Sequence, residues 1–180
     1  MRTNMNNGDF DIVVIGSGVI GHSIAFRLKQ DAPQLKIAVL GDPVNSLQAS
    51  RAAAGMLAPF CECDRVDPFF RFCRESLDKF PEFLRELASV SEVSVHFSFS
   101  GSLMPSSSYR ETWEERKAFF ASEDIPHELW SRQQVRQKAP YLAEDCGEVM
   151  WVGEGQVNNR QMHDALIQAS GKLGIHVLEA

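Results

Sequence analysis

A strand, a glycine-rich turn and a helix follow one another without interruption near the start of this 180-residue chain. The run Phe10–Ile15 is short, apolar and rich in β-branched residues, which is typical of a strand buried on both faces of a parallel sheet. After the turn at 16–21, apolar residues recur at every fourth position from 20 to 28, and a second short apolar run occupies 36–40. This order predicts an α/β fold that begins with a Rossmann-type nucleotide-binding unit.

Each glycine of the turn has its own physical reason. Gly16 permits the tight turn, Gly18 lets a pyrophosphate approach the backbone, and Gly21 lets the helix pack closely on the strand. The helix that follows offers free N–H groups and the positive end of its dipole to phosphates. A turn without a ligand is the alternative, but the flanking strand and helix, and Ala25 four residues beyond Gly21, favour a dinucleotide site.

The acid that binds the ribose in such units stands about 20 residues beyond the glycines, at the end of the second strand. Gly41 occupies the position directly after that strand, and Asp42 follows it, 21 residues beyond Gly21. Asp42 is therefore our candidate for the ribose hydroxyls. The alternative is an acid in a surface turn before Pro43.

The middle of the chain mixes helical and extended patterns. Asp67-Pro68 opens a long helix whose apolar residues, Phe69 and Phe72 among them, keep to one broad side. The alternation from 94 to 104 predicts a strand or a hairpin around Gly101.

Residues typical of helix N-termini predict three further helices. Ser108-x-x-Glu111 and Ser131-x-x-Gln134 are capping boxes, each placed before a helix. Asn158 caps a later helix, which carries one apolar face and leads into a strand at 175–178 after a strand at 148–152. The apolar face consists of Met162, Ala165, Leu166 and Ala169.

The composition excludes several classes of protein. A hydrophobic fraction of 44% and a net charge of −6 describe an ordinary globular chain without the basic surface that nucleic acids require. We find no apolar run long enough to span a bilayer and no signal-peptide core, so we expect a cytoplasmic protein without a transmembrane segment.

The cysteines and histidines give no metal site. Cys61 and Cys63 lack a second pair of ligands at the spacing that zinc sites use, so we expect reduced thiols and no bound metal. The five histidines lie on separate predicted elements, and each is interpreted as a solvated or packed residue rather than a catalytic one.

The segment Ala49–Pro59 (Ala-Ser-Arg-Ala-Ala-Ala-Gly-Met-Leu-Ala-Pro) resembles the flavin-contacting stretch of the D-amino-acid oxidase family of flavoproteins, above all the glycine oxidases of thiamine biosynthesis. Small side chains there let backbone amides approach the flat isoalloxazine ring. The resemblance implies that FAD is the cofactor. It places the contacts to FAD, in addition to the three glycines, at Val19, Ile20, Asp42, Ala49, Ser50, Ala54, Gly55 and Met56.

The resemblance extends from Phe10 to the end of the chain and implies three segments. Residues 1–60 form the FAD-binding unit with its flavin-contacting loop, 61–157 form part of an α+β substrate domain, and 158–180 return to the FAD-binding domain. The family's chains run well beyond this length, so we expect an N-terminal half with an incomplete fold. The arginine that clamps the substrate carboxylate belongs to the other half, so no catalytic residue is assigned, and Arg51 is interpreted as a surface or flavin-adjacent side chain.

In the intact family the reaction implied is oxidation of a small amino acid, glycine or a D-amino acid, to the imine and then the keto acid with release of peroxide. The partners implied are the amino acid and dioxygen or another electron acceptor, with a homo-oligomer as a further possibility. Two alternatives stay open. One is a truncated FAD-binding fragment without activity, and the other is a module that binds NAD, against which the alanine-rich segment counts.

Overall fold

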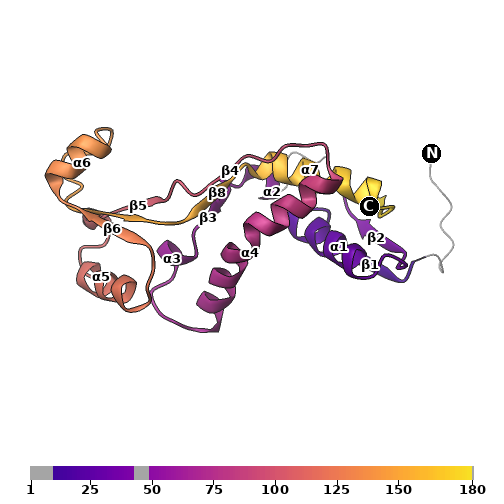
Figure 1. Ribbon diagram of the computed structural model, residues 1–180, viewed down its shortest axis with the longest axis horizontal. Coiled ribbons are helices and arrows are strands. Elements are labelled where there is room, and N and C mark those ends of the chain that lie inside the picture. The colour runs from indigo at the N-terminus through magenta and orange to yellow at the C-terminus, as the bar shows by residue number, and fades with distance from the viewer. Residues whose placement is uncertain (1–9, 43–48, 180) are drawn as a thin grey trace. The chain divides into compact units, whose positions relative to one another are not determined.

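Residues 12 to 40 fold as the strand, turn, helix and strand that the glycine pattern predicts. In this computed structural model, which describes residues 10–42 and 49–179, β1 (Ile12–Ile15) and β2 (Ile37–Leu40) pair in parallel with Ile12 opposite Ile37. Helix α1 (Val19–Asp31) connects the two strands (Figure 1).

A third strand comes from the far end of the chain. Helix α7 (Asn159–Lys172) packs against α1 and leads into β9 (His176–Leu178), which pairs in parallel with β2. The sheet order is β1-β2-β9, and α1 side chains such as Ala25 pack with β2 in its core. The predicted terminal strand is thus confirmed, with β2 as its neighbour.

The two strands of the glycine unit differ in burial. Ile37, Ala38 and Val39 of β2 are fully buried, as the apolar run predicts. In β1, however, Val13 is 50% exposed and Ile15 is 84% exposed, so the prediction of burial on both faces is wrong for this strand. β1 lies at the edge of the sheet among the described residues, and its pairing with β2 alone leaves one side uncovered.

The described chain divides into two compact units. Among the described residues, the first unit comprises 10–42, 49–55, 81–96 and 157–179, and the second comprises 56–80 and 97–156. Residues 81–96, which include the end of the long helix α4 (Pro68–Val90), therefore belong to the first unit.

The second unit is built on antiparallel strands. One sheet has the order β3-β8-β4 and the other has the order β5-β7-β6. Their bounds are β3 Met56–Leu57, β4 Phe97–Ser98, β5 Ser102–Pro105, β6 His127–Trp130, β7 Val149–Val152 and β8 Gly155–Val157. β4 and β5 belong to different sheets, so the predicted hairpin around Gly101 is wrong; Gly101 instead has a positive φ of 83° where the chain passes between them.

Short helices complete the two units. Their bounds are α2 Ala49–Ala52, α3 Pro59–Glu62, α5 Trp113–Ser122 and α6 Arg132–Lys138, with a 3₁₀ turn η1 at Ser106–Ser108. The capping box of Ser131 and Gln134 is confirmed, and so is the Asn158 cap of α7. The Ser108 box is wrong, because Ser108 lies in η1 and Thr112 is the residue before α5.

An aromatic core fills the second unit. On α4, Phe70 is buried and packs against Phe60 and Phe119, whereas Phe69 and Phe72 are 65% and 70% exposed. The helical pattern therefore identified the element correctly but placed these two phenylalanines on its buried side wrongly. The core is extended by Leu77, Met104, Trp113, Phe120, Ile125, Met150 and Val152.

None of the helices in the described part of the chain is long and apolar enough to cross a membrane.

Candidate functional site

The glycine turn of the first unit is closed by two backbone contacts that only glycine allows. Gly16 has a φ of +111°, and its N–H donates to the Leu40 carbonyl at 2.8 Å, which ties the turn to the end of β2. A Cβ on Gly21 would lie 1.8 Å from the Gly16 carbonyl oxygen. The first and third glycines therefore have the roles that the sequence predicts for a tight turn and for close helix packing.

The N-terminus of α1 points out of this turn without a side-chain cap from Gly18. The N–H of Val19 donates to Ser50 Oγ at 3.0 Å, and a Cβ on Gly18 would lie 2.8 Å from that same oxygen. The side chain of Ile20, in the first turn of α1, is 72% exposed. Thus three of the predicted FAD contacts, Val19, Ile20 and Ser50, lie at one helix end, and a helix dipole favours negative charge at such an end.

The conformation of the residue directly after β2 explains why the candidate ribose-binding acid lies one position later than the pattern predicts. Gly41 has a φ of +152°, and its N–H donates to the Leu178 carbonyl at 2.8 Å. A Cβ on Gly41 would lie 2.7 Å from Ser17 Oγ, so a larger residue there would press on the glycine turn. Asp42 follows with an exposed side chain at the same end of the sheet.

The flavin-contacting segment predicted from the sequence is held by the start of α7. The Ser50 carbonyl accepts a hydrogen bond from Asn159 Nδ2 at 2.6 Å, and the Gly55 carbonyl accepts one from Val157 N at 2.9 Å. A Cβ on Gly55 would lie 1.9 Å from the Val157 carbonyl oxygen. Ala49 and Ala54 remain exposed, which keeps small side chains at the surface of this segment.

Sequence reasoning missed Asn159 as an anchor of that segment. Its partner Ser50 is 109 residues away along the chain, and no local pattern links the two. Arg51, which we interpreted as a surface or flavin-adjacent side chain, forms an ion pair with Asp164 of α7 at 2.9 Å.

Met56 opens the second unit in β3, where it pairs with Gln156, and its side chain is 57% exposed.

Two histidines lie buried behind the glycine turn. His163 of α7 donates from Nε2 to the Ser17 carbonyl at 2.9 Å, and His22 Nδ1 lies 2.9 Å from Ser170 Oγ. Their rings meet edge to face with centroids 5.9 Å apart. Burial, and then the neighbouring His163, lower the pKa of His22 from 6.5 to about 4. The two histidines are packed, as the sequence suggested, but they are packed against each other, which sequence reasoning missed.

A buried carboxylate organises the second unit. Glu154 Oε1 accepts hydrogen bonds from the N–H groups of Phe60 and Cys61, both at 2.7 Å, at the start of α3. Burial, and then the Glu154 carboxylate, raise the pKa of the Cys61 thiol. Arg116 stacks on Tyr109 and donates to the Cys61 carbonyl at 3.3 Å. All four cysteines are free thiols.

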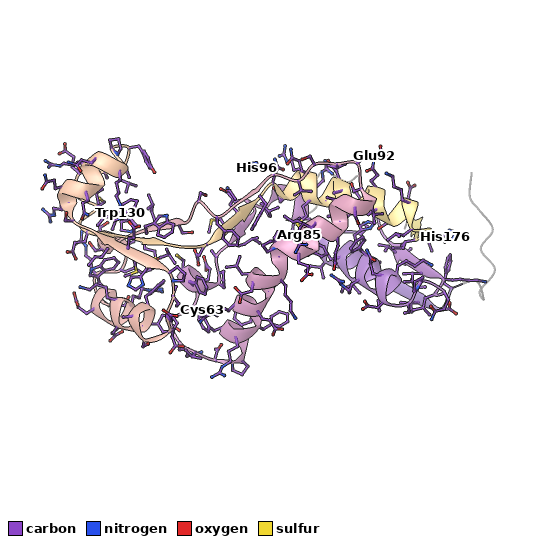
Figure 2. All side chains as sticks on the ribbon, viewed as in Figure 1. Cys63, Arg85, Glu92, His96, Trp130 and His176 are labelled. Atoms are coloured by element: carbon purple, nitrogen blue, oxygen red, sulfur yellow. The ribbon has the colours of Figure 1, made fainter. Side chains whose placement is uncertain are left out.

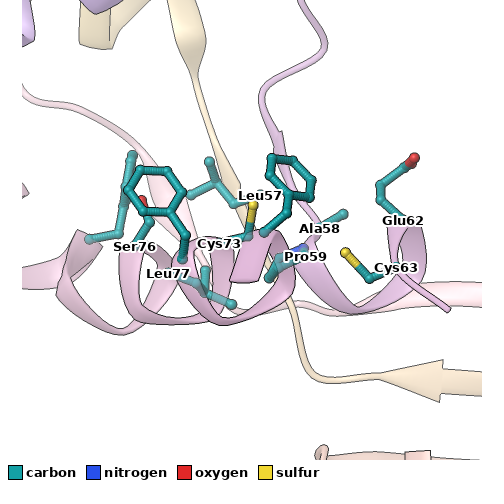
Figure 3. A pocket seen from close by; sticks show the side chains of 11 residues that line it. Leu57, Ala58, Pro59, Glu62, Cys63, Cys73, Ser76 and Leu77 are labelled. Atoms are coloured by element: carbon teal, nitrogen blue, oxygen red, sulfur yellow. The ribbon is translucent and has the colours of Figure 1, made fainter. Parts of the chain in front are cut away.

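An apolar pocket of about 310 Å³ also lies in the second unit. Figure 3 shows that helix α4 lines one side and the segment from Leu57 to Cys63 lines the other. Burial raises the pKa of the Cys63 thiol, so this pocket holds a protonated sulfur at neutral pH. The remaining lining residues are Ala58, Pro59, Glu62, Phe69, Phe72, Cys73, Ser76, Leu77 and Phe80. Across residues 10–42 and 49–179 no group of three or more metal-ligating side chains comes together.

Comparisons with known proteins agree with this geometry. A model of the family described as FAD dependent oxidoreductase matches residues 11–180. The chain is 30% identical over 177 residues to the bifunctional protein ThiO/ThiG of Synechocystis sp., covering 94% of this chain and 24% of that protein. It is 26% identical over 172 residues to the glycine oxidase of Bacillus subtilis, covering 94% of this chain and 45% of that enzyme.

Solved structures show the same fold. The crystal structure of glycine oxidase from Geobacillus kaustophilus superposes with a TM-score of 0.85 at 24% identity, over 94% of this chain and 46% of that one. The L-α-glycerophosphate oxidase of Mycoplasma pneumoniae, solved with FAD bound, superposes with a TM-score of 0.75 at 15% identity, over 94% of this chain and 44% of that one. The chain thus spans less than half the length of these relatives, and the expected α/β, Rossmann-type and incomplete fold is confirmed.

Proposed function

The chain belongs to the family of FAD-dependent oxidoreductases, and from that premise we propose that its first unit binds FAD as part of an amino-acid oxidase. The resemblance inferred from the residues is confirmed at the level of the family. Because the chain spans less than half the length of its relatives, the substrate, the reaction and the partners are parts of the proposal.

One observation carries the proposal: the closed glycine turn at the end of α1. A Cβ at Gly21 would clash with the Gly16 carbonyl oxygen, so only a glycine fits at that position. The turn also holds the start of α1 close to the end of β2 through the hydrogen bond from Gly16 to Leu40. Because Gly18 has no side chain, there is a space next to its backbone, and a Cβ at this position would begin to fill it. This cradle has the shape and the dipole that a pyrophosphate requires, so the residues present fit the cofactor.

The remaining predicted contacts have consistent roles in this proposal. Asp42 accepts hydrogen bonds from the ribose hydroxyls, since it is exposed at the end of β2. Ala49, Ser50, Ala54 and Gly55 offer a surface of small side chains to the flavin ring, anchored from behind by α7. Met56, which follows Gly55 along the chain, is the last of the predicted contacts, and its apolar side chain is exposed.

FAD, when bound, would supply the oxidising ring for hydride removal from the α-carbon of glycine or a small D-amino acid; peroxide would be the product where dioxygen is the final acceptor. The chain's own part is to hold the cofactor and to orient it. We assign no described residue to the substrate carboxylate or to a proton transfer.

Flavin titration tests the binding step. We expect added FAD to lose fluorescence on binding to the purified chain, and Gly18→Val to abolish this binding while the far-ultraviolet circular dichroism stays unchanged. The valine meets only the end of the Ser50 side chain, which can move, so the fold survives while the phosphate space is filled. Equal affinity of the variant and the parent would contradict the proposed pyrophosphate site.

A peroxide-coupled assay tests the reaction. The FAD-supplemented chain is given glycine, sarcosine and D-alanine, and peroxide release is followed. Sustained release supports the oxidase and contradicts the alternative of an inactive FAD-binding fragment. Bound FAD without release supports the fragment, and tighter binding of NAD than of FAD supports the remaining alternative.

A further inference from the structure

The buried histidine pair contacts the turn that we propose for the pyrophosphate. His22 and His163 are both fully buried, and so is the nearby Ser170, while Ser17 is 4% exposed. Ser17 stands between the first two glycines of the turn, so His163, on α7, contacts the middle of the proposed phosphate-binding turn.

The contact with Ser17 fixes the proton on His163. A carbonyl oxygen can only accept, so Nε2 of His163 carries the hydrogen of the 2.9 Å bond. His163 Nδ1 and His22 Nε2 are buried and have no hydrogen-bond partner among the described residues.

The direction of the Ser17 carbonyl decides what the turn offers to a phosphate. In a trans peptide the C=O and the following N–H point in opposite directions. With the Ser17 oxygen held toward His163, the N–H of Gly18 points away from His163. If this peptide rotated, a carbonyl oxygen would take the place of that N–H group, and Gly18, which flanks the peptide, has no Cβ to resist the rotation.

We propose that His163 is a positioning residue for the dinucleotide-binding turn: it fixes the Ser17–Gly18 peptide so that Gly18 presents its N–H to the ligand. The inference rests on the proposed FAD-binding role of the turn. It assigns a function to a residue that lies on α7, outside the turn itself.

Two variants of one residue test the positioning role. His163→Gln keeps an N–H close to the position of Nε2, whereas His163→Met keeps the volume and removes the donor. In FAD titrations at pH 7.5 we expect His163→Met to weaken binding about tenfold, because a buried carbonyl loses its partner, and His163→Gln to stay within about threefold of the parent. His96→Gln, at an exposed histidine of the first unit (Figure 2), is the control and should leave the affinity unchanged.

Equal weakening by both His163 variants, or parental affinity of His163→Met, would overturn the proposal. The two failures have separate meanings: the first makes His163 a packing residue, and the second makes the Ser17 contact irrelevant to the ligand.

A measurement without FAD separates this inference from the proposed function. In the ¹⁵N-labelled chain without FAD, we expect His163→Met to shift the Gly18 amide signal and His163→Gln to leave it near its parental position. A Gly18 signal that stays fixed in His163→Met, or that moves equally in both variants, overturns the inference even if FAD binds. A Gly18 signal that moves in His163→Met alone, in a chain that binds no FAD, upholds the contact and overturns the proposed function.

Discussion

The first and second units both bury ionisable side chains, but they stabilise them in opposite ways. The first unit buries the His22–His163 pair without a counter-charge, and burial, followed by His163, lowers the pKa of His22 to about 4. The second unit buries the Glu154 carboxylate and gives its Oε1 two backbone N–H donors at the start of α3, while Oε2 has no partner among the described residues. The comparison teaches that one unit depends on a neutral imidazole at His22, whereas the other depends on two hydrogen bonds to one carboxylate oxygen.

One glycine from each unit, Gly21 and Gly155, differ in how tightly they are constrained. A Cβ at Gly21 in the first unit would lie 1.8 Å from a backbone oxygen, whereas a Cβ at Gly155 in the second would lie 3.1 Å or more from flexible side chains. Substitution at the two positions therefore distinguishes a rigid backbone contact from an adaptable side-chain contact.

The largest effect is expected from Gly21→Ala. The backbone of the turn cannot move away without separating α1 from β1, so we expect a loss of about 3 kcal/mol or more in the free energy of unfolding, together with loss of FAD binding. Gly155→Ala should cost less than half as much in the same urea titrations. Gly171→Ala, in α7 with no atom within 4 Å of the new Cβ, is the control and should stabilise by about 0.5–1 kcal/mol. A smaller loss for Gly21→Ala than for Gly155→Ala would reverse the comparison.

Removal of the Glu154 carboxylate comes next. Glu154→Ala leaves the N–H groups of Phe60 and Cys61 buried without their acceptor, and we expect a loss of about 3 kcal/mol by chemical denaturation. Glu154→Gln retains an acceptor oxygen and should lose about half as much. Glu144→Ala, at an exposed residue of the same unit, serves as the control. If the alanine and glutamine variants were equally stable, the hydrogen bonds to α3 would not be what the carboxylate contributes.

The pH dependence of stability should identify the neutral histidine of the first unit. Because the pKa of His22 is about 4 in the folded chain and the ordinary pKa of a histidine is 6.5, the unfolded chain binds more protons than the folded chain between these values. This contribution is fully present above pH 6.5 and is lost as the pH falls toward 4, by at most about 3 kcal/mol.

Urea titrations between pH 7.5 and 4.5 measure this slope. His22→Gln removes the titrating group and should flatten the slope, whereas His96→Gln should leave it as in the parent. An unchanged slope in His22→Gln would assign the pH dependence to other groups.

The smallest expected effect concerns Asp42. Loss of a hydrogen bond from a ribose hydroxyl to this carboxylate in Asp42→Ala should weaken FAD about ten- to a hundredfold, which is roughly 1.5–3 kcal/mol. Asp31→Ala, at an exposed acid of α1, is the matched control. An affinity within about twofold of the parent would make Asp42 a turn residue only.

Gly41 sharpens the same comparison, because it directly precedes Asp42 and lies against Ser17 of the glycine turn. The structure predicts that Gly41→Glu weakens FAD binding rather than tightening it. The new side chain would need a positive φ and would press on Ser17 of the glycine turn. Tighter binding in this variant would show that the turn can adapt.

Features that depend only on neighbouring residues could be predicted from the sequence. The glycine turn, the Ser131 capping box and the Asn158 cap are each specified by residues within a few positions, because turns and helix ends are closed by short-range hydrogen bonds. The FAD-binding role of the predicted site residues remains a prediction, since it concerns a ligand rather than the chain.

Two other local sequence patterns were compatible with more than one structure. The box at Ser108 has the right residues, yet Ser108 lies in a 3₁₀ turn, where the Tyr109 N–H bonds to the Ser106 carbonyl. The apolar run of β1 looks like that of β2, yet Ile15 is 84% exposed because burial depends on which elements cover a strand. A pattern of side chains does not specify its own neighbours.

The sequence by itself determined the strand–turn–helix unit, its glycines and the family, because each rests on short-range geometry or on a contiguous motif. Only the tertiary structure brought His163 to Ser17, 146 residues away, and Glu154 to Phe60, 94 residues away. A buried polar group must find a partner wherever the folded chain supplies one, and no spacing along the chain records that partner. The residues that hold the site in place were therefore visible only after folding.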